Sequence, residues 1–355
     1  MEEVRGSSSL TRSRHGGGSP ARFLQAIAPY FGGKRRLLGQ IMKAFPTPAD
    51  APVMIDAFLG GGSVSLMAKA RGYRVVCNDV ALRSAAIGRA FIANDHVTLS
   101  TADVTRLLLP RAIPDGPSDD VLPERHARFV RGAMDVALRL GGAKGALLTV
   151  LVIRYIMSLR PMGNFGAKAV MQQLSEGRWE EVNPAVLRDS FTRRIQSPPQ
   201  TICEELIPKI NAGVFANGHR NEAQQRDAFD FLSDVEGSVV YLDPPYGGTA
   251  AYERALRPLD EILAGRHIDP VPSEFSGRRS VEALDRLIEA CRHIPRLVLS
   301  YGNAVLRPDE LEALVAKHRH NVTVRTIRHA HLAAVSSAEK NATNLEVLVT
   351  GGRPR

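Results

Sequence analysis

The chain has 355 residues, of which 44% are hydrophobic and 23% are charged, an ordinary composition for a globular protein. Its formal net charge of +9 fits a polyanionic partner, although many proteins are basic without binding nucleic acid. No apolar run reaches the roughly 20 residues that span a bilayer, so the sequence does not indicate a membrane protein.

The first 20 residues are rich in Ser, Arg and Gly and have no apolar core, so they do not resemble a secretory signal. We interpret residues 1–20 as a disordered basic tail, with a misassigned start as the alternative. The three cysteines, Cys77, Cys203 and Cys291, are far apart in the sequence. They lack metal-ligand spacing, and they indicate a reducing, cytoplasmic compartment.

A Gly-Gly turn between aromatic residues and a lysine opens the ordered part of the chain, at Tyr30–Lys34. Apolar residues then recur at helical spacing, which predicts a helix over Lys34–Phe45. The glycines would let the backbone approach a ligand closely. Taken alone, the same pattern fits a plain loop-to-helix joint with a solvated Lys34.

The next segment has the order of a nucleotide-type cofactor site. Val53–Phe58 is predicted as a strand, Leu59–Ser63 as a glycine turn, and Val64–Ala70 as a helix. Strand, glycine turn and helix in this order are typical of such sites. The turn therefore predicts a cofactor pocket.

The second strand, Arg74–Cys77, is followed by Asn78 and Asp79. A carboxylate at this point can accept hydrogen bonds from both hydroxyls of a ribose. Because Ser65 stands where a third glycine would complete a dinucleotide fingerprint, the turn suits a cofactor with adenosine but no pyrophosphate.

Between Ala81 and about Arg226 the alternation of strands and helices is lost. Residues 110–123 are rich in Pro and Asp and are typical of a linker, whereas Phe129–Leu140 and Ala146–Leu159 are apolar enough for helices. Arginines and aromatic residues mix in the second half of this segment. We expect an inserted helical domain, and the mixture favours a nucleic-acid surface over a merely solvated face.

The sheet resumes at the apolar run Val239–Leu242, which is followed at once by Asp243-Pro244-Pro245-Tyr246. Since proline has a fixed φ and no N–H, the strand must end there. The loop therefore holds Asp243 and Tyr246 at the carboxyl end of a strand, where ligands bind in open α/β sheets. An acceptor beside a ring suits a planar heterocycle with an exocyclic amine, although a simple strand-ending turn remains an alternative.

The last third of the chain predicts one more helix and three more strands. The helix covers Ser280–Arg292, and the strands cover Leu297–Tyr301, Thr323–Ile327 and Leu345–Thr350. The fold class is therefore α/β, with the last two strands closing the sheet as a pair.

These motifs, in this order, resemble the DNA adenine-N6 methyltransferases of the subgroup whose cofactor motifs come first. Tyr30–Lys34 is similar to the family's Gly-Gly-Lys motif, Asp56 with Phe58–Ser63 to its cofactor loop, and Asp243–Tyr246 to its catalytic tetrapeptide. Ser300-Tyr301 and Asn344–Leu348 resemble later strands, and Gly163–Phe165 is faintly similar to a turn of the recognition insert. The resemblance covers roughly residues 28–80 and 225–350.

The resemblance implies a Rossmann-like, S-adenosylmethionine-dependent methyltransferase sheet with an inserted, mainly helical target-recognition domain. Residues 21–95 and 225–355 would form the catalytic domain, and residues 96–224 the insert. The implied cofactor contacts are Tyr30, Gly33, Lys34, Asp56, Phe58, Gly60, Gly62, Ser63, Asp79, Asp227 and Asp243, with Asp230 as the alternative to Asp227 for the adenine. The candidate DNA contacts are Arg160, Asn164, Arg193 and Arg194.

The implied reaction moves a methyl group from S-adenosylmethionine to the N6 amine of an adenine flipped out of double-stranded DNA. Asp243 and the Pro244 carbonyl would accept the N6 hydrogens, Pro245 would stiffen the loop and Tyr246 would stack on the base, without a metal. Alternatives are a methyltransferase acting on RNA or another planar amine, a catalytically silent DNA-binding relative, and a dinucleotide-dependent oxidoreductase, which the missing third glycine disfavours. Neither a restriction endonuclease partner nor the role of residues 253–274 can be read from the sequence.

Overall fold

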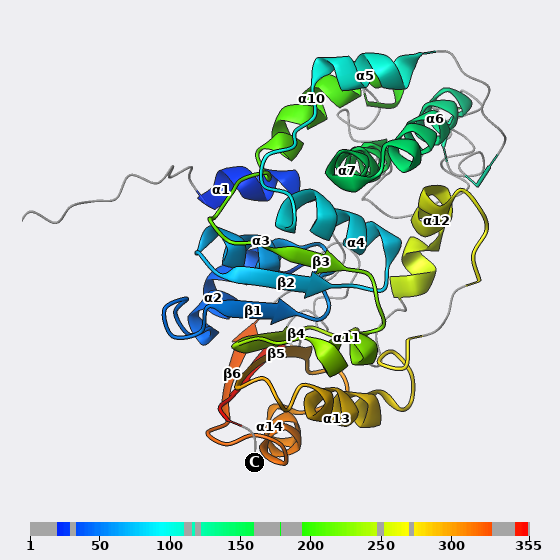
Figure 1. The fold of residues 1–355 in the computed structure, drawn as a ribbon. Coiled ribbons are helices and arrows are strands. Elements are labelled where there is room, and N and C mark those ends of the chain that lie inside the picture. The colour runs from blue at the N-terminus through cyan, green and yellow to red at the C-terminus, as the bar shows by residue number, and fades with distance from the viewer. Residues whose placement is uncertain are drawn as a thin grey trace, which may run out of the picture.

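A computed structural model describes residues 20–28, 33–109, 116–117, 122–159, 178, 194–246, 252–269, 273–328 and 345–353. Its centre is a seven-stranded sheet with the strand order β3-β2-β1-β4-β5-β7-β6 (Figure 1). The strands are β1 Val53–Asp56, β2 Arg74–Asn78, β3 Glu222–Gln224, β4 Val239–Leu242, β5 Arg296–Gly302, β6 Thr323–Arg328 and β7 Leu345–Gly351. Strands β1 to β5 pair in parallel, and β7 runs antiparallel to both β5 and β6.

The strand order reverses between β1 and β4. From β1 the chain steps outward to β2 and β3, and it then returns to place β4 on the other side of β1. At such a switch point the two neighbouring strands continue into loops that lead to opposite sides of the sheet, and a crevice forms between these loops at the carboxyl ends of the strands. Topology alone therefore places the loops after Asp56 and Leu242 beside each other.

Side chains of the central strands alternate between two hydrophobic layers. Met54, Val239 and Tyr241 pack on one face of the sheet, whereas Ile55 and Val240 pack on the other. All four residues of β4 are buried, which explains why a parallel strand covered on both faces is almost continuously apolar.

Helices cover both faces (Figure 1). The shorter elements before the insert are α1 Pro20–Phe23, η1 Leu24–Ala26, η2 Lys34–Arg36, α2 Leu38–Ala44, α3 Ser63–Ala70, α4 Leu82–Ile87 and the π-helix η3 Gly88–Ile92. The later helices are α5 Thr101–Leu108, α6 Glu124–Leu140, α7 Gly142–Leu159, α10 Pro199–Asn211, α11 Ala228–Asp234, α12 Tyr252–Ala264, α13 Ser280–Ala290 and α14 Pro308–Ala316.

Helices α5, α6, α7 and α10 stand together above the sheet in Figure 1, within the segment predicted as an insert. Their buried side chains, such as Leu151 of α7 and Ile202 of α10, belong to the same hydrophobic cluster as Met54 of β1. The group therefore extends one layer of the sheet's core and does not close around a core of its own. The exact domain boundaries remain a prediction.

Helix α7 is apolar nearly all round. Its 18 residues are long and apolar enough to cross a membrane by length and composition, but 67% of this segment is buried in the protein. A helix that is hydrophobic on all sides is expected in the interior of a large domain. Its burial against α4, α6 and α10 gives it the surroundings of a core helix.

The predicted α/β fold class is confirmed, with three local differences. Strand β1 ends at Asp56 and not at Phe58, because the Asp56 carboxylate accepts a hydrogen bond from the Phe58 N–H and turns the chain. The helix predicted over Lys34–Phe45 is split, since its first turn is the tighter 3₁₀ helix η2, closed by the Leu37 N–H on the Lys34 carbonyl. Strand β3, inside the segment predicted as an insert, was not predicted.

Candidate active site

A cavity of about 600 Å³ lies at the carboxyl ends of β1, β2 and β4, at the switch point of the sheet. Its walls come from five parts of the chain: Gly33 and Lys34, the turn after β1, the loop after β2, the start of α11, and the loop after β4. A sixth wall comes from Arg257, Asp260, Ile268, Asp269 and residues 273–275, and all of these except Phe275 lie in the stretch 253–274, whose role the sequence left open.

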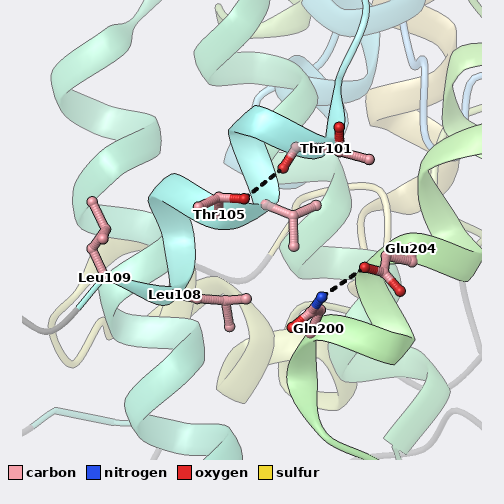
Figure 2. A pocket seen from close by; sticks show the side chains of 7 residues that line it. Thr101, Thr105, Leu108, Leu109, Gln200 and Glu204 are labelled. Atoms are coloured by element: carbon pink, nitrogen blue, oxygen red, sulfur yellow. Dashed lines mark hydrogen bonds between the residues drawn. The ribbon is translucent and has the colours of Figure 1, made fainter.

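A second, smaller hollow of about 320 Å³ lies between α5 and α10 (Figure 2). Its polar side chains bond within their own helices: the Thr105 hydroxyl donates to the Thr101 carbonyl, and the Gln200 amide donates to the Glu204 carboxylate. Such bonds satisfy the polar groups locally and do not aim them at a common point. The convergent polar chemistry therefore lies in the larger cavity.

The turn after β1 depends on glycine at two positions. Gly60 and Gly62 have φ values of +52° and +75°, in the left-handed region that side chains disfavour. A Cβ on Gly62 would also lie 2.8 Å from the Ile87 side chain. The turn can therefore pass close under a ligand and start α3 at Ser63.

Asp79 fixes this turn from the neighbouring strand. One carboxylate oxygen accepts the Gly60 N–H at 2.8 Å and the other accepts the Ala81 N–H at 2.9 Å. Burial raises the pKa of the Asp79 carboxyl, while the two N–H donors and Arg83 oppose that rise. Asp79 lines the cavity, so the predicted ribose contact is compatible with its position and remains a prediction.

Asp56 holds the same turn from within. Its side chain is 1% exposed, and its oxygens accept the Phe58 N–H at 3.3 Å and the Ser65 hydroxyl at 2.6 Å. Burial raises the pKa of this carboxyl from 3.8 to about 7, and the nearby Asp243 and Asp79 raise it further against the Ser65 bond. Ser65, which the sequence marked only as a departure from a glycine pattern, thus positions Asp56.

A cluster of three aromatic rings lies at the next wall. The Phe58 and Phe275 rings meet edge to face at 5.3 Å, and Phe229 stacks on Phe275 at 5.9 Å with an interplanar angle of 14°. Phe58 and Phe275 line the cavity. Aromatic rings on a cavity wall suit a purine, and the sequence analysis missed Phe275, which directly follows the stretch of unassigned role, residues 253–274.

Asp227 lies two residues before Phe229 of this cluster. Its carboxylate caps α11 by accepting the N–H groups of Phe229 and Asp230. Asp227 lines the cavity, whereas the Asp230 carbonyl is bound by Arg226 further along the helix. This placement agrees with the choice of Asp227 for the cofactor adenine, a contact that remains a prediction.

Lys34 is not a solvated lysine. Its side chain is 5% exposed, and its Nζ lies 2.9 Å from the nearer Asp243 oxygen and 3.7 Å from Glu346. The ammonium group also lies 5.1 Å from the centre of the Tyr246 ring. Lys34 and the loop that carries Asp243 and Tyr246, more than 200 residues apart in the sequence, therefore form one cluster.

The loop after β4 places its acid and its ring as the sequence predicted, at the cavity wall with Pro244 and Pro245. Burial raises the pKa of the Asp243 carboxyl above its ordinary value, Lys34 opposes that rise and Glu346 adds to it. The Tyr246 hydroxyl is 3.0 Å from Asp243 and 2.7 Å from Glu346. Sequence reasoning missed Glu346, because its partners are distant in the chain.

Helix α12 closes one side of the cavity. Its Asp260 pairs with Arg83 of α4, and both residues line the cavity. Arg257, one turn earlier, pairs with Glu261 at 2.8 Å. Residues 257–269 and 273–275 therefore contribute a wall of the site.

The predicted cofactor residues largely converge. Those on the cavity wall are Gly33, Lys34, Asp56, Phe58, Gly60, Ser63, Asp79, Asp227 and Asp243, while Gly62 shapes the turn beneath them. Tyr30, Arg160, Asn164 and Arg193 lie outside the described residues. Arg194 is described, and its guanidinium pairs with Glu205 of α10, so its predicted contact with DNA remains a prediction.

A largely parallel seven-stranded sheet with β7 inserted antiparallel, and with a cavity at its switch point, defines a Rossmann-like methyltransferase fold. Residues 30–110 match the model of the D12 class N6 adenine-specific DNA methyltransferases. The chain is also 28% identical over 338 residues to the Type II methyltransferase M2.HphI of Haemophilus parahaemolyticus, covering 90% of this chain and 96% of that protein. The two matches confirm the resemblance found in the sequence and the enzyme class, an adenine-specific DNA methyltransferase.

Proposed function

We propose that the protein moves a methyl group from S-adenosylmethionine to the N6 amine of an adenine flipped out of double-stranded DNA, at a specific site. The observation that carries this proposal is the cluster of Lys34, Asp243 and Tyr246 on the wall of the cavity that the Gly60–Gly62 turn also lines. Methyl donor and target amine can meet in such a space.

The cavity fits the cofactor by several independent features. The turn at Gly60 and Gly61 lines the cavity, Asp79 offers carboxylate oxygens to a ribose, and Phe58 and Phe275 add aromatic surface to the wall. Asp227 on the cavity wall can accept a hydrogen bond from an exocyclic amine. When bound, S-adenosylmethionine would supply a methyl group on a positively charged sulfur.

Asp243 and Tyr246 would act on the target base. Flipping an adenine costs a few kcal/mol, and stacking on a ring such as that of Tyr246 returns about 1–3 kcal/mol. Asp243 and the Pro244 carbonyl would accept the two N6 hydrogens, which frees the nitrogen lone pair to attack. As the new bond forms, the excess proton on N6 passes to the Asp243 carboxylate, whose raised pKa makes it a better proton acceptor.

The test is single-turnover transfer of labelled methyl to duplex DNA, with long-read sequencing of DNA from expressing cells to find the site. Asp243→Ala should lower the rate by about 10²–10³, because a preorganised acceptor is lost. Glu222→Gln is the matched control, since it also removes a carboxylate from the same sheet, one paired with Arg74 away from the cavity. Label found only in RNA, or a wild-type rate for Asp243→Ala, would contradict the proposal.

A restriction endonuclease that cuts the same sequence is the partner we propose, on the strength of the type II relative. The methylated sequence identified by long-read sequencing defines the site such an enzyme would cut. Methylated and unmethylated DNA should then differ in their resistance to cleavage by it.

A further inference from the structure

Glu346 on β7 is a fully buried carboxylate in contact with the catalytic loop, although it lies 100 residues after Tyr246. Its Oε1 accepts hydrogen bonds from the Tyr246 hydroxyl at 2.7 Å and from the Ser300 hydroxyl of β5. The Lys34 ammonium lies 3.7 Å from the same oxygen. One carboxylate thus joins η2, the loop after β4, and two strands.

Burial of a carboxylate is costly unless a cation and hydrogen-bond donors compensate the charge. Glu346 has both, in Lys34 and in the hydroxyls of Tyr246 and Ser300. Lys34 is shared, because it also pairs with Asp243 at 2.9 Å. Glu346 and Asp243 therefore draw on the same two partners, Lys34 and Tyr246.

The Tyr246 hydroxyl has a single hydrogen to share between Glu346 and Asp243. A tyrosine hydroxyl has one hydrogen, so it can donate to one carboxylate at a time. The Tyr246 oxygen is 2.7 Å from Glu346 and 3.0 Å from Asp243, so Glu346 is the nearer acceptor. While Glu346 takes that hydrogen, the facing Asp243 oxygen keeps its capacity to accept a hydrogen from elsewhere.

The Tyr246 ring is held as closely as its hydroxyl. A Cβ on Gly302 of β5 would lie 2.6 Å from the ring, and the Tyr301 ring centre is 5.1 Å from that of Tyr246. The ring is therefore seated against β5, which fixes the hydroxyl relative to both acids.

Resting on the proposed function, we propose that Glu346 is a positioning residue for methyl transfer. It takes the Tyr246 hydrogen and shares Lys34, so that Asp243 remains available to accept an N6 hydrogen of the target adenine. Glu346 would not touch the base, and its effect would pass through Tyr246 and Lys34.

The test is a set of three variants in the full chain, measured by single-turnover methyl transfer to duplex DNA. Glu346→Gln keeps the shape but removes the charge, so the Tyr246 hydrogen should turn to Asp243 and the rate should fall roughly 10- to 100-fold. Tyr246→Phe has no hydroxyl hydrogen to misdirect, so it should lose clearly less rate than Glu346→Gln. The double variant should be faster than Glu346→Gln alone, because the competing hydrogen is gone.

A purely structural role predicts the opposite order, with the double variant slower than either single one. That order, or a wild-type rate for Glu346→Gln, would overturn the role of Glu346. If Glu346→Gln does not fold, a severe loss in a folded Tyr246→Phe would still overturn it. Glu222→Gln should match wild type throughout. A wild-type protein that methylates no DNA would overturn the proposed function and this role together, whereas an active wild type beside an equally active Glu346→Gln would overturn this role alone.

Discussion

Removal of the buried charge at Asp56 should change how stability depends on pH. The carboxyl has a pKa of about 7 in the folded protein, against 3.8 for an ordinary aspartate, because burial disfavours its charged form. Below about pH 4 the carboxyl is protonated in both states. Between about 4 and 7 the folded protein keeps a proton that the unfolded chain has released, so stability falls as pH rises and the loss is complete above the folded pKa.

The size of this effect follows from the shift. From 3.8 to about 7 is about 3 pKa units, and each unit is worth 1.36 kcal/mol, so Asp56 lowers the free energy of unfolding by up to about 4 kcal/mol across this range. Asp56→Asn keeps a side chain that can bond the Phe58 N–H and Ser65 hydroxyl, but it has no charge to bury. Relative to wild type, the variant should therefore gain stability from pH 4.5 to about pH 7, and the gain should level off above that pH.

Urea denaturation followed by circular dichroism, at several pH values between 4.5 and 8, measures this difference. Asp79 and Asp243 also have raised pKa values, so the wild-type slope contains their contributions. The difference between the two proteins therefore reports Asp56 together with its repulsion of these two carboxylates. Parallel curves for wild type and Asp56→Asn would show that Asp56 is ionised throughout, and would refute the reasoning.

Two further predictions concern the cofactor turn. Gly62→Ala places a Cβ 2.8 Å from Ile87 at a φ of +75°, and it should lower both the melting temperature and the affinity for S-adenosylmethionine. The control Gly72→Ala has a φ of +93° but nothing within 4 Å of the new Cβ, so it should be destabilised only by the roughly 1 kcal/mol of backbone strain. Equal losses of stability in the two variants would contradict the role of the Ile87 contact. Asp79→Ala removes the acceptor of the Gly60 N–H, so calorimetry should show cofactor binding weakened by on the order of 1.5–3 kcal/mol. An unchanged affinity would contradict this prediction.

Local patterns in the sequence predicted the parts of the site that are local in space. The strand, glycine turn and helix around Gly60, and the acid and prolines after β4, are contiguous segments whose hydrophobic period and breakers define their shape. Strand β3 was not predicted because Glu222–Gln224 has only three residues and lacks an apolar pattern. It forms a strand because β2 offers it a parallel partner.

Residues that act through distant partners were not predictable in the same way. From the sequence alone Lys34 could be either solvated or functional, and only the fold shows that it pairs with Asp243. Glu346 looks like an ordinary residue in an apolar run until the fold places it beside Lys34. Both are buried charges, and a sequence shows the charge without showing its partner. Phe275 is similar, since its value lies in the rings of Phe58 and Phe229, which come from other parts of the chain.

The charges around the cavity also bear on which cofactor it suits. Within the described part of the chain, seven acidic side chains and three basic ones line it. A crevice with this excess of acids repels a pyrophosphate and attracts a cation, because fields are strong where burial limits screening. Burial disfavours the charged forms of Asp56, Asp79 and Asp243 and raises their pKa values. A positively charged sulfonium nearby would stabilise these carboxylates, whereas a neutral or anionic ligand would not. The electrostatics therefore support a sulfonium methyl donor over a dinucleotide, in agreement with the short glycine turn.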